Sequence, residues 1–188
     1  MTITNCHISK FHKIRDITDP VNIMAIEIER KFLVKSDTWR HSVVSSTLMK
    51  QGYLGGGNST VRVRMTDKTA FLTIKGKANG ISRAEFEYEI PVSDAQAMLS
   101  DMTVGTSVEK IRYIVPAEND LFWEVDEYLN ANYPLFTAEI ELPSADTEFA
   151  IPEWLGEEVS DNKNYTNRSL SRAPYSTWVN GAPPAEEN

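Results

Sequence analysis

The stretch that decides the fold is "MAIEIERKFLV", residues 24–34, in which polar and apolar side chains alternate. Glu27, Glu29 and Lys31 share one parity, and the intervening positions are mostly apolar. A period of two predicts a β-strand with two unlike faces. One face of this strand would carry two carboxylates and an ammonium in a row, so it needs an environment that compensates those charges.

The composition limits the class of protein. The chain has 188 residues with 41% hydrophobic content, which suits one domain with a core of its own. Lys and Arg number 19 against 27 Asp and Glu, and the net charge of −8 argues against nucleic-acid or membrane partners. The single cysteine, Cys6, excludes an internal disulfide framework. Without a membrane-length apolar run or a signal peptide, we expect a cytoplasmic protein.

The period of two continues along the chain and predicts eight strands, at 24–34, 49–54, 59–66, 69–77, 81–90, 106–115, 121–128 and 135–142. Helices are predicted at 36–44, 93–102, 152–159 and 162–172. We expect a flexible leader at 1–23, one domain at 24–172 and a tail at 173–188 that frays unless Tyr175 and Trp178 dock.

Charged residues in these strands are also spaced by two, with apolar neighbours. The ordinary explanation for one strand is the wet face of an antiparallel sheet. Here, however, like charges recur in sets on single strands, and such sets repel unless acidic and basic strands share a face. The acidic set is Glu85, Glu87, Glu124, Asp126, Glu139 and Glu141, and the basic set is Arg62, Arg64, Lys75, Arg83, Lys110 and Arg112.

These two sets suit one kind of ligand. Carboxylate oxygens hold hard divalent cations, commonly together with substrate phosphates. Arg offers a planar fork to phosphate, and Lys a compact point charge. A closed sheet of about eight strands has room inside for one small ligand. We therefore predict an α+β protein in which an eight-stranded antiparallel β-barrel forms a charged tunnel with helices packed on the outside.

The motifs also resemble a known family. "EIERK" at 27–31 matches the ExExK signature of the CYTH superfamily, the triphosphate tunnel metalloenzymes, and is most similar to its short bacterial branch. Ordered blocks continue the resemblance over residues 24–172: "QGYL" at 51–54, "VRVR" at 61–64, "LTIKG" at 72–76, "SRAEFEYEI" at 82–90, "VEKIRY" at 108–113, "WEVDEY" at 123–128, "AEIELP" at 138–143 and "WLGEEVSDNKNYTNRSL" at 154–170.

The resemblance implies an inorganic triphosphatase that needs Mg²⁺ or Mn²⁺ and cleaves tripolyphosphate to pyrophosphate and phosphate. It implies metal ligands at Glu27, Glu29, Glu85, Glu87, Glu124, Asp126, Glu139 and Glu141, although Glu85 and Glu87 could instead orient basic residues. It implies phosphate-binding residues at Lys31, Arg62, Arg64, Lys75, Arg83, Lys110 and Arg112, and catalytic residues at Glu27, Glu29, Lys31, Tyr53 and Lys163. Asn164 departs from the family, which often has an arginine there.

Several alternatives stay open. The same fold serves adenylate cyclases and nucleoside or thiamine triphosphatases, but cyclases tend to have a His-Phe pair before ExExK, where this chain has residues 23–26, "IMAI". A non-catalytic polyphosphate-binding module would not need the acidic pairs. A purely structural barrel would bury many charges at high cost. A homodimer is an open alternative for its assembly. Hydrolysis of tripolyphosphate is the leading prediction.

Overall fold

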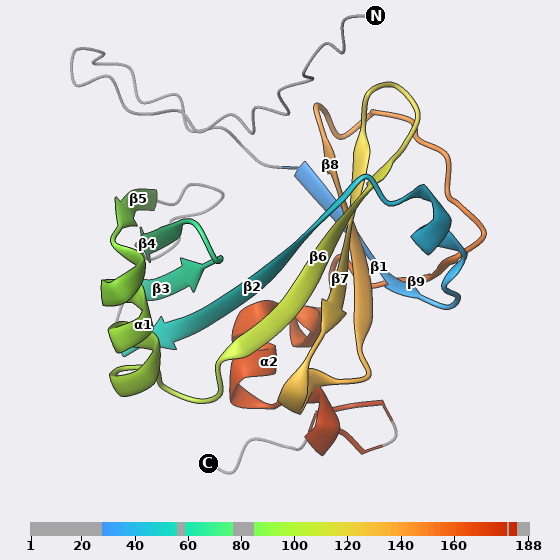
Figure 1. Ribbon diagram of the computed structural model, residues 1–188. Coiled ribbons are helices and arrows are strands. Elements are labelled where there is room, and N and C mark those ends of the chain that lie inside the picture. Colours follow the sequence, from blue (N-terminus) through green and yellow to red (C-terminus); the bar gives the residue numbers. More distant parts are fainter. Residues whose placement is uncertain (1–27, 56–58, 77–84, 180, 184–188) are drawn as a thin grey trace, which may run out of the picture.

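A computed structural model describes residues 28–55, 59–76, 85–179 and 181–183 (Figure 1). Glu27, Arg83 and the predicted leader lie outside the described residues. The described part forms one antiparallel sheet of nine strands, β1 (Ile28–Val34), β2 (Ser45–Leu54), β3 (Thr60–Met65), β4 (Ala70–Lys75), β5 (Glu85–Ile90), β6 (Val108–Pro116), β7 (Phe122–Tyr128), β8 (Phe136–Leu142) and β9 (Leu155–Glu158). The helices are α1 (Val92–Asp101) and α2 (Asn167–Arg172), with 3-10 turns η1 (Thr38–Ser42), η2 (Asn130–Asn132), η3 (Lys163–Tyr165) and η4 (Tyr175–Thr177).

The eight strands predicted from alternation correspond to β1 to β8, and the α+β antiparallel fold class is confirmed. β2 begins four residues earlier than predicted, because its first half is a polar run that pairs with β6 from Ser45 to Gln51. The helix predicted at 152–159 is wrong. This segment instead contributes β9, which pairs with the free edge of β1 and satisfies its backbone groups.

The sheet order is β5-β4-β3-β2-β6-β7-β8-β1-β9. The long strands β2 and β6 cross the molecule and join one half, where α1 lies beside β3 and β4, to the other half, formed by β7, β8, β1 and β9 (Figure 1). Among the described residues the edge strands β5 and β9 do not pair with each other, so this sheet has two open edges and one strand more than predicted.

One face of the sheet is apolar. Its larger core cluster includes Phe32, Trp123 and Ile140, with Trp39 from η1 and Trp154 from the segment before β9 packed against them. Phe32 and Trp123 meet edge to face, with ring centroids 5.7 Å apart. This cluster holds β1, β7 and β8 in register and leaves their alternate residues to the opposite face.

A smaller cluster covers the other half of the same face. The apolar side of α1, carrying Ala95 and Leu99, packs on Val63 of β3 and Ala70 of β4, as expected for a helix on the outside of the sheet. Gly52 of β2 makes this close approach possible, because a Cβ there would lie 2.5 Å from the Thr103 hydroxyl oxygen. α1 thereby fixes the ends of β2 and β3.

The C-terminal segment lies on the opposite, charged face of the sheet. The sequence predicts that all helices pack on the outside, and for α2 this prediction is wrong. Leu170 of α2 and Tyr165 of η3 pack with Val108 and Tyr128, which have the same parity as Lys110. Trp178 stacks at a tilt on Tyr165, with centroids 5.2 Å apart. This segment therefore covers one end of the charged face. In the part of the chain that the structure describes, no helix is long and apolar enough to cross a membrane.

Candidate active site

The strand register brings the predicted acidic and basic residues of one half onto a common face. Lys31 lies directly opposite Glu139 across β1 and β8, and Glu139 lies opposite Glu124 across β8 and β7. On the next pair, Asp126 lies opposite Arg112. Side chains of directly opposed residues project to the same side of an antiparallel sheet, so these five form one charged surface.

Arg112 is the centre of this surface. Its Nε and Nη2 donate to the two carboxylate oxygens of Asp126 at 2.7 and 2.6 Å. Nη2 also donates to Glu139 at 2.8 Å, and Nη1 donates to Glu124. A guanidinium held by three carboxylates has its orientation fixed, because each bond restrains a different part of the planar fork.

Two lysines complete the network. Lys31 lies 2.7 Å from Glu139, and its ammonium also donates to the Tyr165 carbonyl at 3.3 Å. Lys110 pairs with Asp126, which is fully buried. The chain of pairs thus runs from Lys31 through Glu139, Arg112 and Asp126 to Lys110. Each charge in it has an opposite partner, which is the condition for charges to be stable in a poorly solvated place.

Burial and pairing shift the pKa values in this network in opposite directions. Burial disfavours ionised Asp126, but Arg112 and Lys110 outweigh it and hold the pKa of Asp126 well below its usual range. Burial, reinforced by the Arg112 charge, lowers the pKa of Lys110 to about 8. Partial desolvation, reinforced by repulsion from Glu139, raises the pKa of Glu29. A further positive charge nearby would therefore favour the ionised form of Glu29.

The carboxylate edge of this face is a candidate metal centre. Glu29 lies directly opposite Glu141, and Glu139 is the next residue of that parity on β8. Their oxygens are hard donors that suit Mg²⁺ or Mn²⁺. Desolvation raises the pKa of Glu29, and repulsion from Glu139 and Glu141 adds to the rise. Across the described ranges, no three ligand side chains are grouped tightly enough to form a ready-made metal site. Glu124, Asp126 and Glu139 are turned toward Arg112 instead.

The other half of the sheet holds a second charged group. Glu87 of β5 lies 3.5 Å from Arg62 and 3.8 Å from Arg64, both on β3. The Thr73 hydroxyl donates to Glu87 at 2.6 Å, and Lys75 pairs with Glu85 at 2.8 Å. Glu85 and Glu87 are thus placed among basic residues, and β4, β3 and β2 lie between their strand, β5, and β6, which carries Arg112. This placement matches the alternative that they orient bases.

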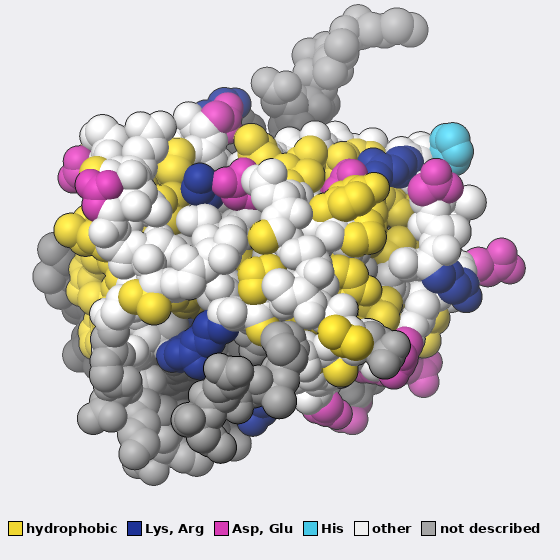
Figure 2. Space-filling view, turned by 90° about the horizontal axis from the view of Figure 1, so that it is seen from below, with side chains coloured by type: hydrophobic (Ala, Val, Ile, Leu, Met, Phe, Trp, Pro, Cys, Tyr) yellow, Lys and Arg dark blue, Asp and Glu magenta, His cyan; other side chains and the backbone are white. Residues whose placement is uncertain are grey.

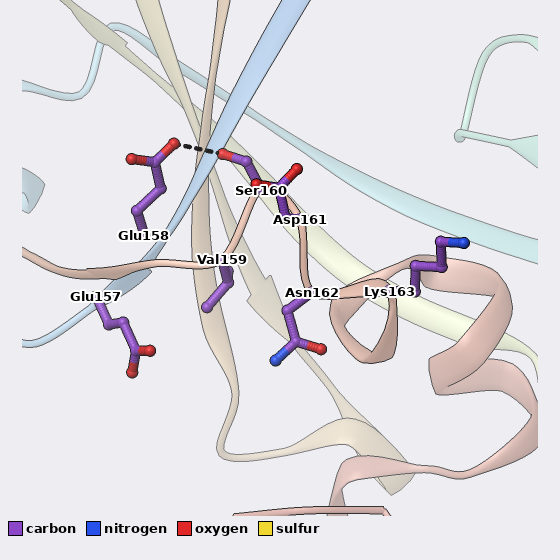
Figure 3. Close-up of a pocket in the computed structure, with 7 residues that line it drawn as sticks. All are labelled: Glu157, Glu158, Val159, Ser160, Asp161, Asn162 and Lys163. Carbon is purple, nitrogen blue, oxygen red and sulfur yellow. Dashed lines mark hydrogen bonds between the residues drawn. The ribbon is translucent and has the colours of Figure 1, made fainter. Parts of the chain in front are cut away.

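The two remaining predicted catalytic residues lie at the margins. Tyr53 of β2 is opposite Arg62, and its hydroxyl accepts a hydrogen bond from Gln51 at 3.0 Å. Lys163 begins η3 on an exposed loop, where residues 157–163 line an open pocket of about 720 Å³. Figure 3 shows its side chain pointing away from those of Glu157 and Glu158. Within the described residues, Lys163 is not brought together with the Arg112 network.

Sequence reasoning missed two residues near the charged face. Thr73 donates to Glu87 and accepts from Arg62 at 3.2 Å, and its parity with Lys75 in "LTIK" is the signal that could have found it. Arg168 of α2 donates to the Thr60 hydroxyl of β3. Only its spacing of four residues from Asn164, about one helical turn, would have drawn attention to it.

Fold and site together define a class: an antiparallel sheet with one face packed under apolar elements and the other lined by paired acids and bases, suited to a phosphate-rich ligand. The chain belongs to the CYTH family, because the CYTH domain matches residues 25–174. CYTH triphosphate tunnel metalloenzymes are metal-dependent.

Similar proteins agree on this assignment. The chain is 41% identical to the inorganic triphosphatase of Acetivibrio thermocellus over 156 residues, which cover 82% of this chain and 99% of that protein. It is 35% identical to the inorganic triphosphatase of Nitrosomonas europaea, covering 77% of this chain and 96% of that one. The crystal structure of an inorganic triphosphatase superposes with a TM-score of 0.64 at 32% identity, covering 79% and 95% of the two chains. This neighbour supports the tunnel form of the fold.

Proposed function

We propose that this protein is a metal-dependent hydrolase that cleaves inorganic tripolyphosphate to pyrophosphate and phosphate. The observation that carries the proposal is the network in which Arg112 bridges Asp126, Glu124 and Glu139 on the charged face of the sheet. Two relatives with 41% and 35% identity are inorganic triphosphatases, which supports the same activity here.

Phosphoanhydride hydrolysis depends on holding the chain of phosphates in place and neutralising charge on the transferred group. Arg112 and Lys31 would bind phosphate oxygens from one half of the face, and Arg62 and Arg64 from the other half. In the structure these bases are already paired with carboxylates. Binding therefore exchanges one set of negative partners for another and creates no unpaired buried cation.

The carboxylates keep the bases in position for this exchange. Asp126 is fully buried and holds both Arg112 and Lys110, so it acts as an internal anchor more than as a ligand open to solvent. In the other half, Glu87 and Thr73 likewise hold Arg62 in place. Fixed cations need little reorganisation when negative charge develops on the transferred phosphoryl group.

Mg²⁺ or Mn²⁺ would be held by Glu29 and Glu141, with Glu139 beside them. Glu27, the further ligand that the sequence predicts, lies outside the described residues. When bound, the ion supplies further charge neutralisation for the phosphates and favours ionised water as the nucleophile. The donor chemistry fits, since desolvation and then the neighbouring carboxylates raise the pKa of Glu29, and a cation would relieve the repulsion between the carboxylates.

The surface fits a confined phosphate ligand better than a nucleic acid. Viewed from below, Lys and Arg side chains lie in small separate groups among apolar and neutral areas, and acidic groups lie among them (Figure 2). Long nucleic acids are usually bound by a continuous basic stripe. Because the chain has a net charge of −8, positive potential that could attract phosphate is confined to local groups of side chains.

The test is phosphate release from tripolyphosphate, ATP and thiamine triphosphate, each with Mg²⁺, with Mn²⁺ and with EDTA. We expect the highest kcat/KM for tripolyphosphate and no turnover in EDTA. Turnover of ATP or thiamine triphosphate above that of tripolyphosphate would reassign the substrate. Inactivity on all three with tight binding of tripolyphosphate would instead indicate a binding module.

A further inference from the structure

A small pocket lies between α2 and the β2–β3 hairpin, beside the charged face. It has a volume of about 240 Å³, and its lining includes Tyr53 and Thr60 from the hairpin strands and Arg168, Ser171 and Arg172 from α2. Its lining residues include no carboxylate, whereas Arg112 on the charged face is paired with three.

The side of α2 that faces the pocket is held firmly. Leu170 is fully buried, the Tyr128 hydroxyl donates to the Asn167 side-chain oxygen at 3.0 Å, and the Thr106 amide donates to the Ser171 carbonyl at 2.7 Å. Arg168 and Arg172 are four residues apart, so they lie on one side of the helix, and both line the pocket. The two guanidinium groups are therefore presented together by a fixed support.

Neither arginine has an acidic partner in the part of the chain that the structure describes. Arg168 donates only to the Thr60 hydroxyl, and Arg172 takes part in no described ion pair. By contrast, Lys31, Arg62 and Lys110 on the charged face are each paired with a carboxylate. The pocket thus carries uncompensated positive charge next to hydroxyl groups, which is the chemistry that binds a phosphate group.

The pocket adjoins the charged face at Tyr53. This residue lines the pocket and lies directly opposite Arg62 on β3. Burial raises the pKa of Tyr53, while the positive charges of Arg62, Arg168 and Arg64 oppose the rise, so groups of the pocket and of the charged face both act on its hydroxyl. A phosphate chain gripped by Arg62 and Arg64 would reach the pocket at this point.

The size of the pocket limits what enters it. Pockets for organic ligands of ordinary size span about 300–1,000 Å³. At about 240 Å³, this pocket lies below that range and has room for a single phosphate group. A terminal phosphate has three non-bridging oxygens and an internal phosphate has two, so the terminal group satisfies two guanidinium forks more fully.

We propose that this pocket is a subsite for the terminal phosphate of the substrate, and that Arg168 and Arg172 are specificity-determining residues that hold it. The inference rests on the proposed function for the identity of the phosphate chain. Neither arginine belongs to the alternating strands, so this role follows from their place on α2.

The test compares Arg168→Gln, Arg172→Gln and the double variant with wild type, using calorimetric titration without metal. The probes are tripolyphosphate and cyclic trimetaphosphate, which has no terminal phosphate. We expect each variant to bind tripolyphosphate about tenfold more weakly, the usual effect of one charged hydrogen bond, with trimetaphosphate affinity changed less than twofold. Arg168→Lys should restore part of the affinity. Lys68→Gln, in the exposed turn after β3, removes the same charge elsewhere and should change neither.

Kinetics provide the second readout. The double variant should raise KM for tripolyphosphate with little change in kcat, because the pocket lies apart from the Arg112 network. Unchanged tripolyphosphate affinity and KM in the double variant would overturn the subsite while leaving the proposed hydrolysis standing. If wild type hydrolyses no triphosphate yet binds tripolyphosphate in an arginine-dependent way, the proposed function fails and the subsite stands. An equal loss of affinity for trimetaphosphate would also overturn the terminal-phosphate assignment.

Discussion

Arg112 and Asp126 face each other across β6 and β7 and are joined by two parallel hydrogen bonds of 2.7 and 2.6 Å. Asp126 is fully buried and also holds Lys110. The resemblance to metalloenzymes implies a metal ligand at Asp126, but this geometry assigns it first to keeping two cations in place. A carboxylate in that position contributes to folding as well as to activity.

The Asp126→Asn variant should be strongly destabilised, because it leaves Lys110 and Arg112 with one fewer charge in a buried place. Breaking a buried ion pair from one side costs about 3–5 kcal/mol. Urea unfolding gives the free energy of unfolding directly. The matched control is Lys50→Gln, which breaks the Lys50–Glu109 pair on the exposed part of β2 and β6 and should cost less than about 1 kcal/mol. Equal losses in the two variants would contradict the anchoring role.

The Glu29→Gln variant should behave in the opposite way. Desolvation disfavours the charge of its carboxylate, and repulsion from Glu139 and Glu141 adds to this effect, so its pKa is raised. A neutral amide should therefore leave the unfolding free energy within about 0.5 kcal/mol of wild type or slightly higher. Metal-dependent turnover should fall at least about 100-fold, as for loss of a preorganised electrostatic group. Normal activity together with a large drop in melting temperature would rule out this role.

Adding Mg²⁺ should stabilise the folded protein, because a cation relieves repulsion between Glu29 and Glu141. A ligand present at 100 times its Kd adds about 2.7 kcal/mol to the free energy of unfolding. Thermal melts with Mg²⁺ and with EDTA, without substrate, measure this. In the Glu29→Gln variant, the difference in melting temperature between Mg²⁺ and EDTA should be smaller than in wild type. An identical rise in both proteins would place the ion elsewhere.

The Gly52→Ala variant should be destabilised by overpacking beneath α1. Its new methyl group would lie 2.5 Å from the Thr103 hydroxyl oxygen and 2.8 Å from a Leu99 methyl carbon. Insertion of a methyl group into a packed site costs about 1–3 kcal/mol. Gly55→Ala, three residues along the chain, meets its nearest neighbour at 3.7 Å and serves as the control. Denaturant unfolding of both proteins is the measurement, and equal stability would exclude the close packing of α1 on β2.

The sequence by itself determined which side chains share the charged face. In an antiparallel sheet, residues that face each other point to the same side, so an alternating pattern keeps its parity from strand to strand. Glu29, Lys31, Arg62, Arg112 and Glu139 could therefore be assigned to one surface from spacing alone. Recognition of the family from ordered motifs needed no coordinates either, and the CYTH match over 25–174 confirms it.

Only the tertiary structure decided which charges meet. The pairing of Arg112 with Glu124, Asp126 and Glu139 depends on the register of three strands, and alternation carries no information on register beyond parity. β9 forms because the edge of β1 offers free backbone groups to a segment 121 to 126 residues further along the chain, and no local sequence pattern predicts such a pairing. The pocket at Arg168 and Arg172 exists because buried contacts of Leu170 bring α2 onto the charged face. Parity is a local property of the chain, whereas register, edge pairing and helix docking are set by contacts between residues distant in sequence.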